Sequence, residues 1–213
     1  MIFSSLGALF RVWHKFETLC LSKYWARKFN HAGANISIGS DFNCYKPECV
    51  HIDDGVVIAN GVTIRAVTTY PWGNQQQSFS PSISLMKGCF INNRTHITAT
   101  TGVTIGDEVM IAENCFISDH THSHEDPHSS VMRQPLASNG PLTIGSGSWI
   151  GENCTIVGAL SIGKHTVVGS NSVVTSDLPD HCVAVGAPAR IIRLWDADSN
   201  SWRKHVPLDD SLP

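Results

Sequence analysis

The sequence predicts an all-β solenoid, a parallel β-helix, and three observations lead to this prediction. Branched apolar residues recur every six positions, glycine follows many of them, and a small residue lies four positions after them. A period of six fits neither an amphipathic helix nor an ordinary alternating strand. It fits short flat strands joined by tight corners, with three strands to a coil and each coil stacked on the next.

The repeat extends over most of the chain, and each of its positions has an expected role. The periodic apolar residues are predicted to point inward: Ile52, Ile58, Ile64, Leu85, Ile91, Ile97, Ile105, Ile111, Ile117, Ile144, Ile150, Ile156, Ile162, Val168 and Val174. The small residues are predicted to point inward beside them: Val109, Cys115, Ser148, Cys154, Thr166 and Ser172. The glycines are expected to permit the backbone angles of the corners: Gly106, Gly145, Gly151, Gly163 and Gly169.

Three segments follow from this pattern: a helical segment at 1–31, the β-helix at 32–193 and a C-terminal extension at 194–213. Apolar residues in the first segment are spaced by three and four, which marks one face of a helix. Interrupting basic residues exclude a signal peptide or a membrane span. We expect this helix to pack on the main domain or on a neighbouring subunit, with a peripheral membrane contact as the alternative. Both end segments are candidate caps for the open ends of the solenoid.

Composition narrows the class of function. The net charge of −3 gives no electrostatic footprint for a nucleic-acid partner. The seven cysteines include no CxxC pair and are interpreted as buried, reduced thiols. We therefore expect a cytoplasmic protein, with the inner face of the membrane as a second location.

The repeat breaks at 118–143, a polar loop that contains His120, His122, His124 and His128. Loops of this length in compact domains are usually functional or disordered. Zinc binding, a solvated loop and a catalytic histidine are all open from the residues alone. A second interruption at 68–82 is either part of an acceptor wall or a tolerated insertion.

Three segments carry a resemblance to a known family. They are ISDHTH at the start of the loop, GPLTIGSGSWIGENCTI at the return to the coil, and VVGSNSVVTSDLPDHCVAVGAPARIIR at the end of the repeat. From about residue 84 to residue 193 the chain resembles the maltose, galactoside and polysaccharide O-acetyltransferases of the hexapeptide-repeat family. The resemblance implies a left-handed β-helix, a homotrimer and acetyl-CoA as the acyl donor, with no metal required.

The resemblance also implies roles for residues around the loop. His120 is expected to be the general base, with His122 as its competitor. Trp149 is expected to line the reacting pocket or to pack at a subunit interface. Asn92 matches a family asparagine that contacts the acceptor, or else stacks inside a corner. Asp119 is expected on the acceptor side, where it helps to set the loop; its position in sequence does not by itself bring the carboxylate to the imidazole ring.

The terminal coil resembles a coenzyme A groove. Ser170, Thr175, Ser176, Arg190 and Arg193 are expected to bind the coenzyme, the two arginines through its phosphates. Position 176 is serine where relatives often carry lysine. Gly151 and Glu152 are also placed on the coenzyme side, where a backbone N–H near them is expected to stabilise an oxyanion.

The resulting hypothesis is an acetyl-CoA-dependent O-acetyltransferase acting on a sugar hydroxyl of a cell-surface polysaccharide or its precursor. The alternatives are a zinc-dependent hydrase like the β-helix carbonic anhydrases, an N-acetyltransferase of amino sugars or antibiotics, and a non-catalytic scaffold.

Overall fold

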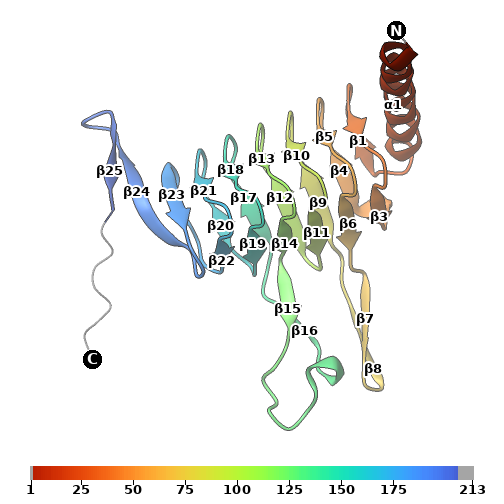
Figure 1. Ribbon diagram of the computed structural model, residues 1–213. Coiled ribbons are helices and arrows are strands. Elements are labelled where there is room, and N and C mark those ends of the chain that lie inside the picture. The colour runs from red at the N-terminus through yellow and green to blue at the C-terminus, as the bar shows by residue number, and fades with distance from the viewer. Residues whose placement is uncertain (1, 206–213) are drawn as a thin grey trace.

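In the computed structural model, which describes residues 2–205 and their side chains from residue 12 onward, the chain forms a left-handed parallel β-helix (Figure 1). Three sheets, called here faces A, B and C, run along the solenoid, and each coil contributes one strand to each face. The corners between them are called A/B, B/C and C/A in chain order. This architecture confirms the predicted fold class.

The strands are short, as the six-residue period requires. Face A contains β1 (His31–Ala32), β4 (Val50–Ile52), β9 (Ser82–Leu85), β12 (Gly102–Ile105), β17 (Leu142–Ile144) and β20 (Ser161–Ile162). Face B contains β2 (Ser37–Ile38), β5 (Val57–Ile58), β10 (Phe90–Ile91), β13 (Met110–Ile111), β18 (Trp149–Ile150), β21 (Val167–Val168), β23 (Cys182–Val185), β24 (Arg190–Asp196) and β25 (Ser201–Lys204). Face C contains β3 (Asn43–Tyr45), β6 (Thr63–Ala66), β11 (His96–Ala99), β14 (Phe116–Ser118), β19 (Thr155–Val157) and β22 (Val173–Val174).

The periodic apolar side chains stack directly on one another in the core. In face C, for example, Ile97, Ile117 and Ile156 pair in successive coils, and all three are fully buried. The predicted small inward residues are buried beside them, among them Cys115 and Cys154, whose thiols are free. The six-residue period is therefore the spacing along the chain between the core positions of consecutive faces in one coil. Stacked residues of the same face belong to successive coils.

The glycines that follow the apolar residues have a different role from the expected one. None of the five glycines expected to form corners has a positive φ: these are Gly106, Gly145, Gly151, Gly163 and Gly169. Instead, a Cβ at Gly145 would lie 2.6 Å from the backbone nitrogen of Lys164, and one at Gly151 would lie 2.5 Å from that of Ser170. Close stacking of the coils excludes the side chain. Left-handed backbone occurs two positions further on, for example at Gly147 and Asn153.

The helix α1 (Ile2–Ala26) covers the N-terminal end of the solenoid. Ser22 is buried there, and its Oγ accepts a hydrogen bond of 2.9 Å from the backbone N–H of Ile38 in the first coil. Trp25, in the last turn of the helix, packs against Phe29 and Phe42. The helix thus covers the edge of the first coil, which would otherwise be open, and accepts a hydrogen bond from its backbone. Among the described residues, no helix combines the length and apolar character needed to cross a bilayer.

Replacing Ser22 with alanine is expected to destabilise the protein by about 1–3 kcal/mol, because the buried N–H of Ile38 would lose its acceptor. The matched control is Thr18→Ala, since Thr18 makes the same kind of bond to a carbonyl one turn back, to His14, without contacting the strand. Urea unfolding of both variants measures the difference. Equal stabilities would show that the hydrogen bond from Ile38 contributes nothing to the cap.

The opposite end is closed by antiparallel pairing. β24 folds back on β23, and β25 pairs with β24, where Trp195 and Trp202 meet edge to face. The predicted C-terminal cap is therefore a hairpin that begins at Arg190, slightly before the expected boundary.

Candidate active site

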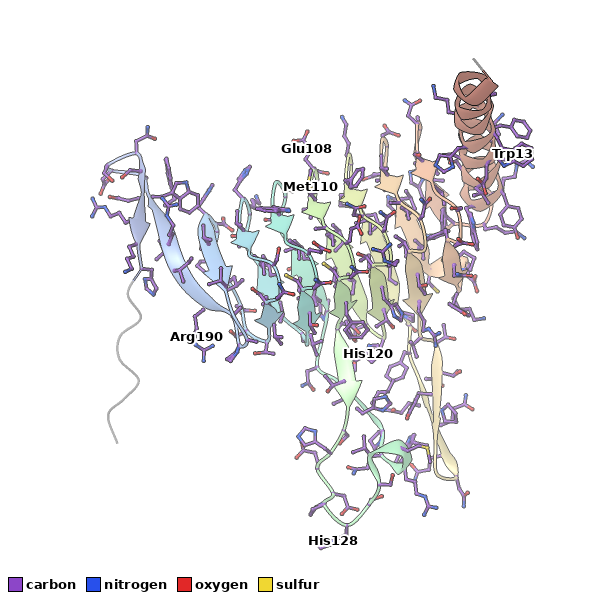
Figure 2. The ribbon with its side chains drawn as sticks, viewed as in Figure 1. Trp13, Glu108, Met110, His120, His128 and Arg190 are labelled. Atoms are coloured by element: carbon purple, nitrogen blue, oxygen red, sulfur yellow. The ribbon has the colours of Figure 1, made fainter. Side chains whose placement is uncertain are left out.

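His120 lies at the C/A corner, where the chain leaves the solenoid after β14 and returns at β17. The excursion forms an antiparallel hairpin of β15 (His120–His122) and β16 (Leu136–Ser138), with the 3-10 turn η2 (Val131–Arg133) near its end. Figure 2 shows His120 at the base of this projection and His128 at its tip. The stack continues undisturbed beneath it, as the sequence predicts, because Ile105 pairs with Ile144 across the gap.

The carboxylate of Asp119 anchors this corner to the coil before it. The side chain has no exposed surface. Its oxygens accept backbone N–H bonds from Thr100 (2.9 Å), Thr101 (2.7 Å) and Gly102 (2.7 Å). Three convergent N–H groups make a strong site for an ionised carboxylate. A direct contact of Asp119 with an acceptor, expected from the sequence, is inconsistent with this burial.

The same carboxylate holds the ring of His120. Asp119 Oδ1 lies 2.7 Å from His120 Nδ1, so the carboxylate does reach the neighbouring ring. Burial opposes ionisation of Asp119, but the hydrogen bonds from His120 and the three backbone N–H groups outweigh it and lower the pKa of the carboxyl. Because an ionised carboxylate only accepts hydrogen bonds, we assign the Nδ1 proton to His120, which leaves Nε2 as a free base when the ring is neutral.

Hydroxyl groups fix the base of the hairpin around this pair. Ser138 Oγ lies 2.7 Å from Thr100 Oγ1 and 2.9 Å from Thr101 Oγ1. Ser118 Oγ donates to the carbonyl of His120 at 2.7 Å. These bonds fix the backbone of His120 and the base of the hairpin, and only 11% of the His120 side chain is exposed.

The second interruption of the repeat leaves from the same corner. It forms the hairpin of β7 (Thr69–Trp72) and β8 (Gln75–Ser78), which projects beside the first one (Figure 1). Gln77 binds the backbone of Leu136 in both directions: its Nε2 donates to the carbonyl at 3.1 Å and its Oε1 accepts the N–H at 2.7 Å. Tyr70 Oη lies 3.3 Å from His122 Nδ1. The two insertions thus form one docked wall next to His120.

Replacing Gln77 with alanine is expected to loosen this wall, since about 1–3 kcal/mol of hydrogen bonding to a backbone strand would be lost. Limited proteolysis should then cut the 123–135 segment several-fold faster. Gln76→Ala is the control, because Gln76 is an exposed neighbour on the same strand. Equal cleavage rates in the two variants would contradict the docking.

Two other expected residues lie away from His120 within one chain. Trp149 is on face B, where it pairs with Met110 and Val167 and is 47% exposed. Asn92 is at the B/C corner, where its Oδ1 accepts the N–H of Asn93. This position is that of the corner asparagine, one of the two alternatives for Asn92.

The backbone N–H groups expected to bind an oxyanion are already used. Gly151 donates to the carbonyl of Val168 at 2.8 Å, and Glu152 donates to Ser170 Oγ at 3.2 Å. Stacking of coils uses these two donors within the chain, and the expected oxyanion donor near Gly151 and Glu152 stays a prediction.

Part of the expected coenzyme set converges at the C-terminal end. Ser176 and Arg190 line a recess of about 180 Å³ together with Asp177 and His205. Thr175 is exposed beside Ser176. Arg193 lies elsewhere, with its guanidinium over the ring of Trp202 at 5.6 Å, and Ser170 is at the B/C corner.

The loop histidines do not form a metal site within the described part of the chain. The only cluster of metal-binding side chains found there is His31, His51 and Asp53 on face A, with the two rings stacked at 4.4 Å. This cluster is at the N-terminal end, several coils from His120.

Sequence reasoning missed the residues that fix the His120 corner and its hairpin. Thr100, Ser138 and Gln77 carry no motif of their own. The interruption at 68–82 was the one available signal for the β7–β8 wall, because it breaks the repeat at the same corner as the loop.

Comparisons with known proteins indicate the family of this chain. The bacterial transferase hexapeptide (six repeats) model matches residues 141–176. WbbJ of Escherichia coli (strain K12), whose name provisionally describes an O-acetyl transferase of lipopolysaccharide biosynthesis, is 33% identical over 76% of this chain and 82% of its own length. The galactoside O-acetyltransferase of the same strain is 32% identical over 63% of this chain and 66% of its own length.

Solved structures agree on the fold. AntD, an N-acyltransferase from Bacillus cereus solved with dTDP and 3-hydroxybutyryl-CoA, has a TM-score of 0.69 at 17% identity, covering 84% of this chain and 90% of its own. The identity of this chain to WbbJ, over most of the length of WbbJ, and the match to the hexapeptide model show its family. The chain belongs to the hexapeptide-repeat acetyltransferase family.

Proposed function

We propose that the protein transfers an acetyl group from acetyl-CoA directly to a sugar hydroxyl of a cell-surface polysaccharide or its precursor, with His120 as general base. The observation that carries this proposal is the 2.7 Å hydrogen bond between His120 Nδ1 and the buried Asp119 carboxylate. The names of the two Escherichia coli relatives support the acceptor class.

The chemistry follows from the orientation of the ring. The acceptor oxygen bonds to the thioester carbonyl carbon while its proton passes to His120 Nε2. The tetrahedral intermediate then collapses, the carbon–sulfur bond breaks, and the coenzyme A thiolate takes the proton from the imidazolium. Asp119 stays ionised and stabilises the positive ring in between.

In this proposal the coenzyme occupies the recess at Ser176 and Arg190. Ser118 and Val157 pair in successive coils, and β22, which precedes Thr175, is one coil further on. Two coil spacings separate the sites by about 10 Å along the solenoid. The Arg190 guanidinium would bind a phosphate, and Thr175 and Ser176 would contact the pantetheine arm.

A homotrimer belongs to the same proposal, since the family is typically trimeric. Face B supports it with a row of outward apolar side chains. The row is Val57, Phe90, Met110, Trp149, Val167 and Val183. Such a row is typical of an interface core. Light scattering should report a trimer, and Trp149→Glu should dissociate it if face B is buried there.

A peripheral membrane contact through α1 is the second part of the proposal, with the protein at the cytoplasmic face of the membrane. Val12, Trp13, Phe16 and Leu19 are exposed, and Figure 2 shows Trp13 on the side of the helix turned away from the solenoid. The only acidic residue of this segment is Glu17. Co-sedimentation with anionic vesicles, lost in Trp13→Glu, would support the contact; no sedimentation of the wild type would refute it.

The test of the activity is thiol release from acetyl-CoA with a panel of sugars and amino sugars, with and without a chelator. Release that depends on a hydroxyl acceptor and is insensitive to chelator supports the proposal. Transfer to amines alone would select the N-acetyltransferase. Chelator-sensitive hydration of carbon dioxide without thiol release would select the zinc hydrase.

A further inference from the structure

A second recess lies on the N-terminal side of His120, where the chain leaves face C for the β7–β8 hairpin. It measures about 190 Å³ and is lined by Tyr45, Arg65 and the segment 66–69. The Arg65 guanidinium carbon is 4.5 Å from the centre of the Tyr45 ring. Among the side chains that the structure describes, no carboxylate forms an ion pair with Arg65. A pre-oriented guanidinium at the edge of a recess is therefore without a counter-charge.

The position of Arg65 relative to the base follows from strand register. Arg65 pairs with Thr98, and Thr98 pairs with Ser118 in the next coil. Two strand spacings give about 10 Å between Arg65 and Ser118 along face C. Since Ser118 is hydrogen-bonded to His120, this distance suits one hexose ring that carries a charged substituent.

The recess and the proposed base share one wall. The chain runs from the recess directly into β7, whose Tyr70 contacts His122 at the other insertion. The charge of Arg65 also affects His96 on the neighbouring strand. Burial lowers the pKa of His96, and repulsion from the Arg65 guanidinium lowers it further. A guanidinium held in this way can bind two oxygens of one anion at once.

We propose that the recess at Arg65 and Tyr45 is an acceptor subsite that binds an anionic group of the saccharide, either a phosphate or a carboxylate. This inference rests on the proposed sugar O-acetyltransferase. In this arrangement the acceptor spans the distance from Arg65, which binds its charged group, to His120, which receives the hydroxyl to be acetylated.

Equilibrium binding tests the subsite without turnover. The probes are hexose 1-phosphates, methyl hexuronides and neutral methyl hexosides of common hexose configurations. We expect at least one anionic probe to bind wild type about tenfold more tightly than its neutral partner, a difference of about 1.4 kcal/mol. The phosphate and uronide arms identify which anion it is.

Variants of the two lining residues make the test specific. Arg65→Gln should remove the preference for the anion, and Tyr45→Phe, which keeps the ring, should retain it. Arg94→Gln is the matched control, because Arg94 is exposed on another corner and paired with Glu113. Equal affinities for charged and neutral probes in the wild type, no binding of any probe, or a preference that survives in Arg65→Gln would overturn the subsite. Arg65-dependent binding without acetyl transfer would preserve the subsite and refute the proposed reaction.

Discussion

His120→Ala is expected to lower kcat/KM for acetyl transfer by about 10²–10⁴-fold, which is the usual contribution of a positioned general base. The loss should appear in kcat, because the imidazole acts on the reacting hydroxyl and does not hold the coenzyme. The affinity for coenzyme A and the thermal midpoint should stay close to wild type, since His120 lies outside the stacked core. Steady-state kinetics, coenzyme titration and thermal melting measure these three effects.

His122→Ala is the matched comparison for this variant. His122 is exposed and lies two positions after His120 on the same strand. Its ring contacts Tyr70 rather than a carboxylate. We expect a rise in the acceptor KM with kcat within a fewfold of wild type. The reverse pattern, with kcat lost in His122→Ala and retained in His120→Ala, would move the base to His122.

Asp119→Asn is expected to reduce both the rate and the stability. The amide directs an N–H₂ group toward backbone donors or toward the ring, so at least one buried N–H loses its acceptor. A loss of about 2–4 kcal/mol in the free energy of unfolding is reasonable for a buried charged acceptor of several bonds. The rate should fall by about 10²–10⁴-fold, since the ring loses the partner that sets its tautomer. Chemical denaturation and single-turnover kinetics separate the two effects.

The stability effect of Asp119 should depend on pH in one direction. The pKa of its carboxyl is lowered in the folded protein, so its contribution is fully present above the unfolded value of about 4 and is lost as the pH falls through the lower folded pKa. The difference in unfolding free energy between wild type and Asp119→Asn should therefore shrink on acidification below about pH 4. Asp126→Asn, which changes an exposed carboxylate in the same loop, should show neither effect.

The sequence was sufficient for the core and the corner positions. A period of six with branched residues predicts the stack of Ile105 on Ile144, because identical environments recur in every coil and select the same residue type. It also predicts that the loop leaves at a corner, since residues 118–143 fall between complete coils. The reason given for the glycines was wrong, because only the stacked structure shows which backbone atoms of the next coil a Cβ would meet.

The sequence by itself therefore determined the solenoid and the place of the loop, and its resemblance to the acetyltransferase family made His120 the candidate base. The tertiary structure decided what surrounds that base: the carboxylate of Asp119 on its ring, the donors from Thr100 to Gly102 on that carboxylate, and the second hairpin docked through Gln77. It also decided that Trp149 and Asn92 lie away from His120 in the same chain. The physical reason is that the repeat is a local rule between neighbouring coils. Contacts between two insertions about 60 residues apart depend on where each leaves the corner and on single hydrogen bonds, and these have no period.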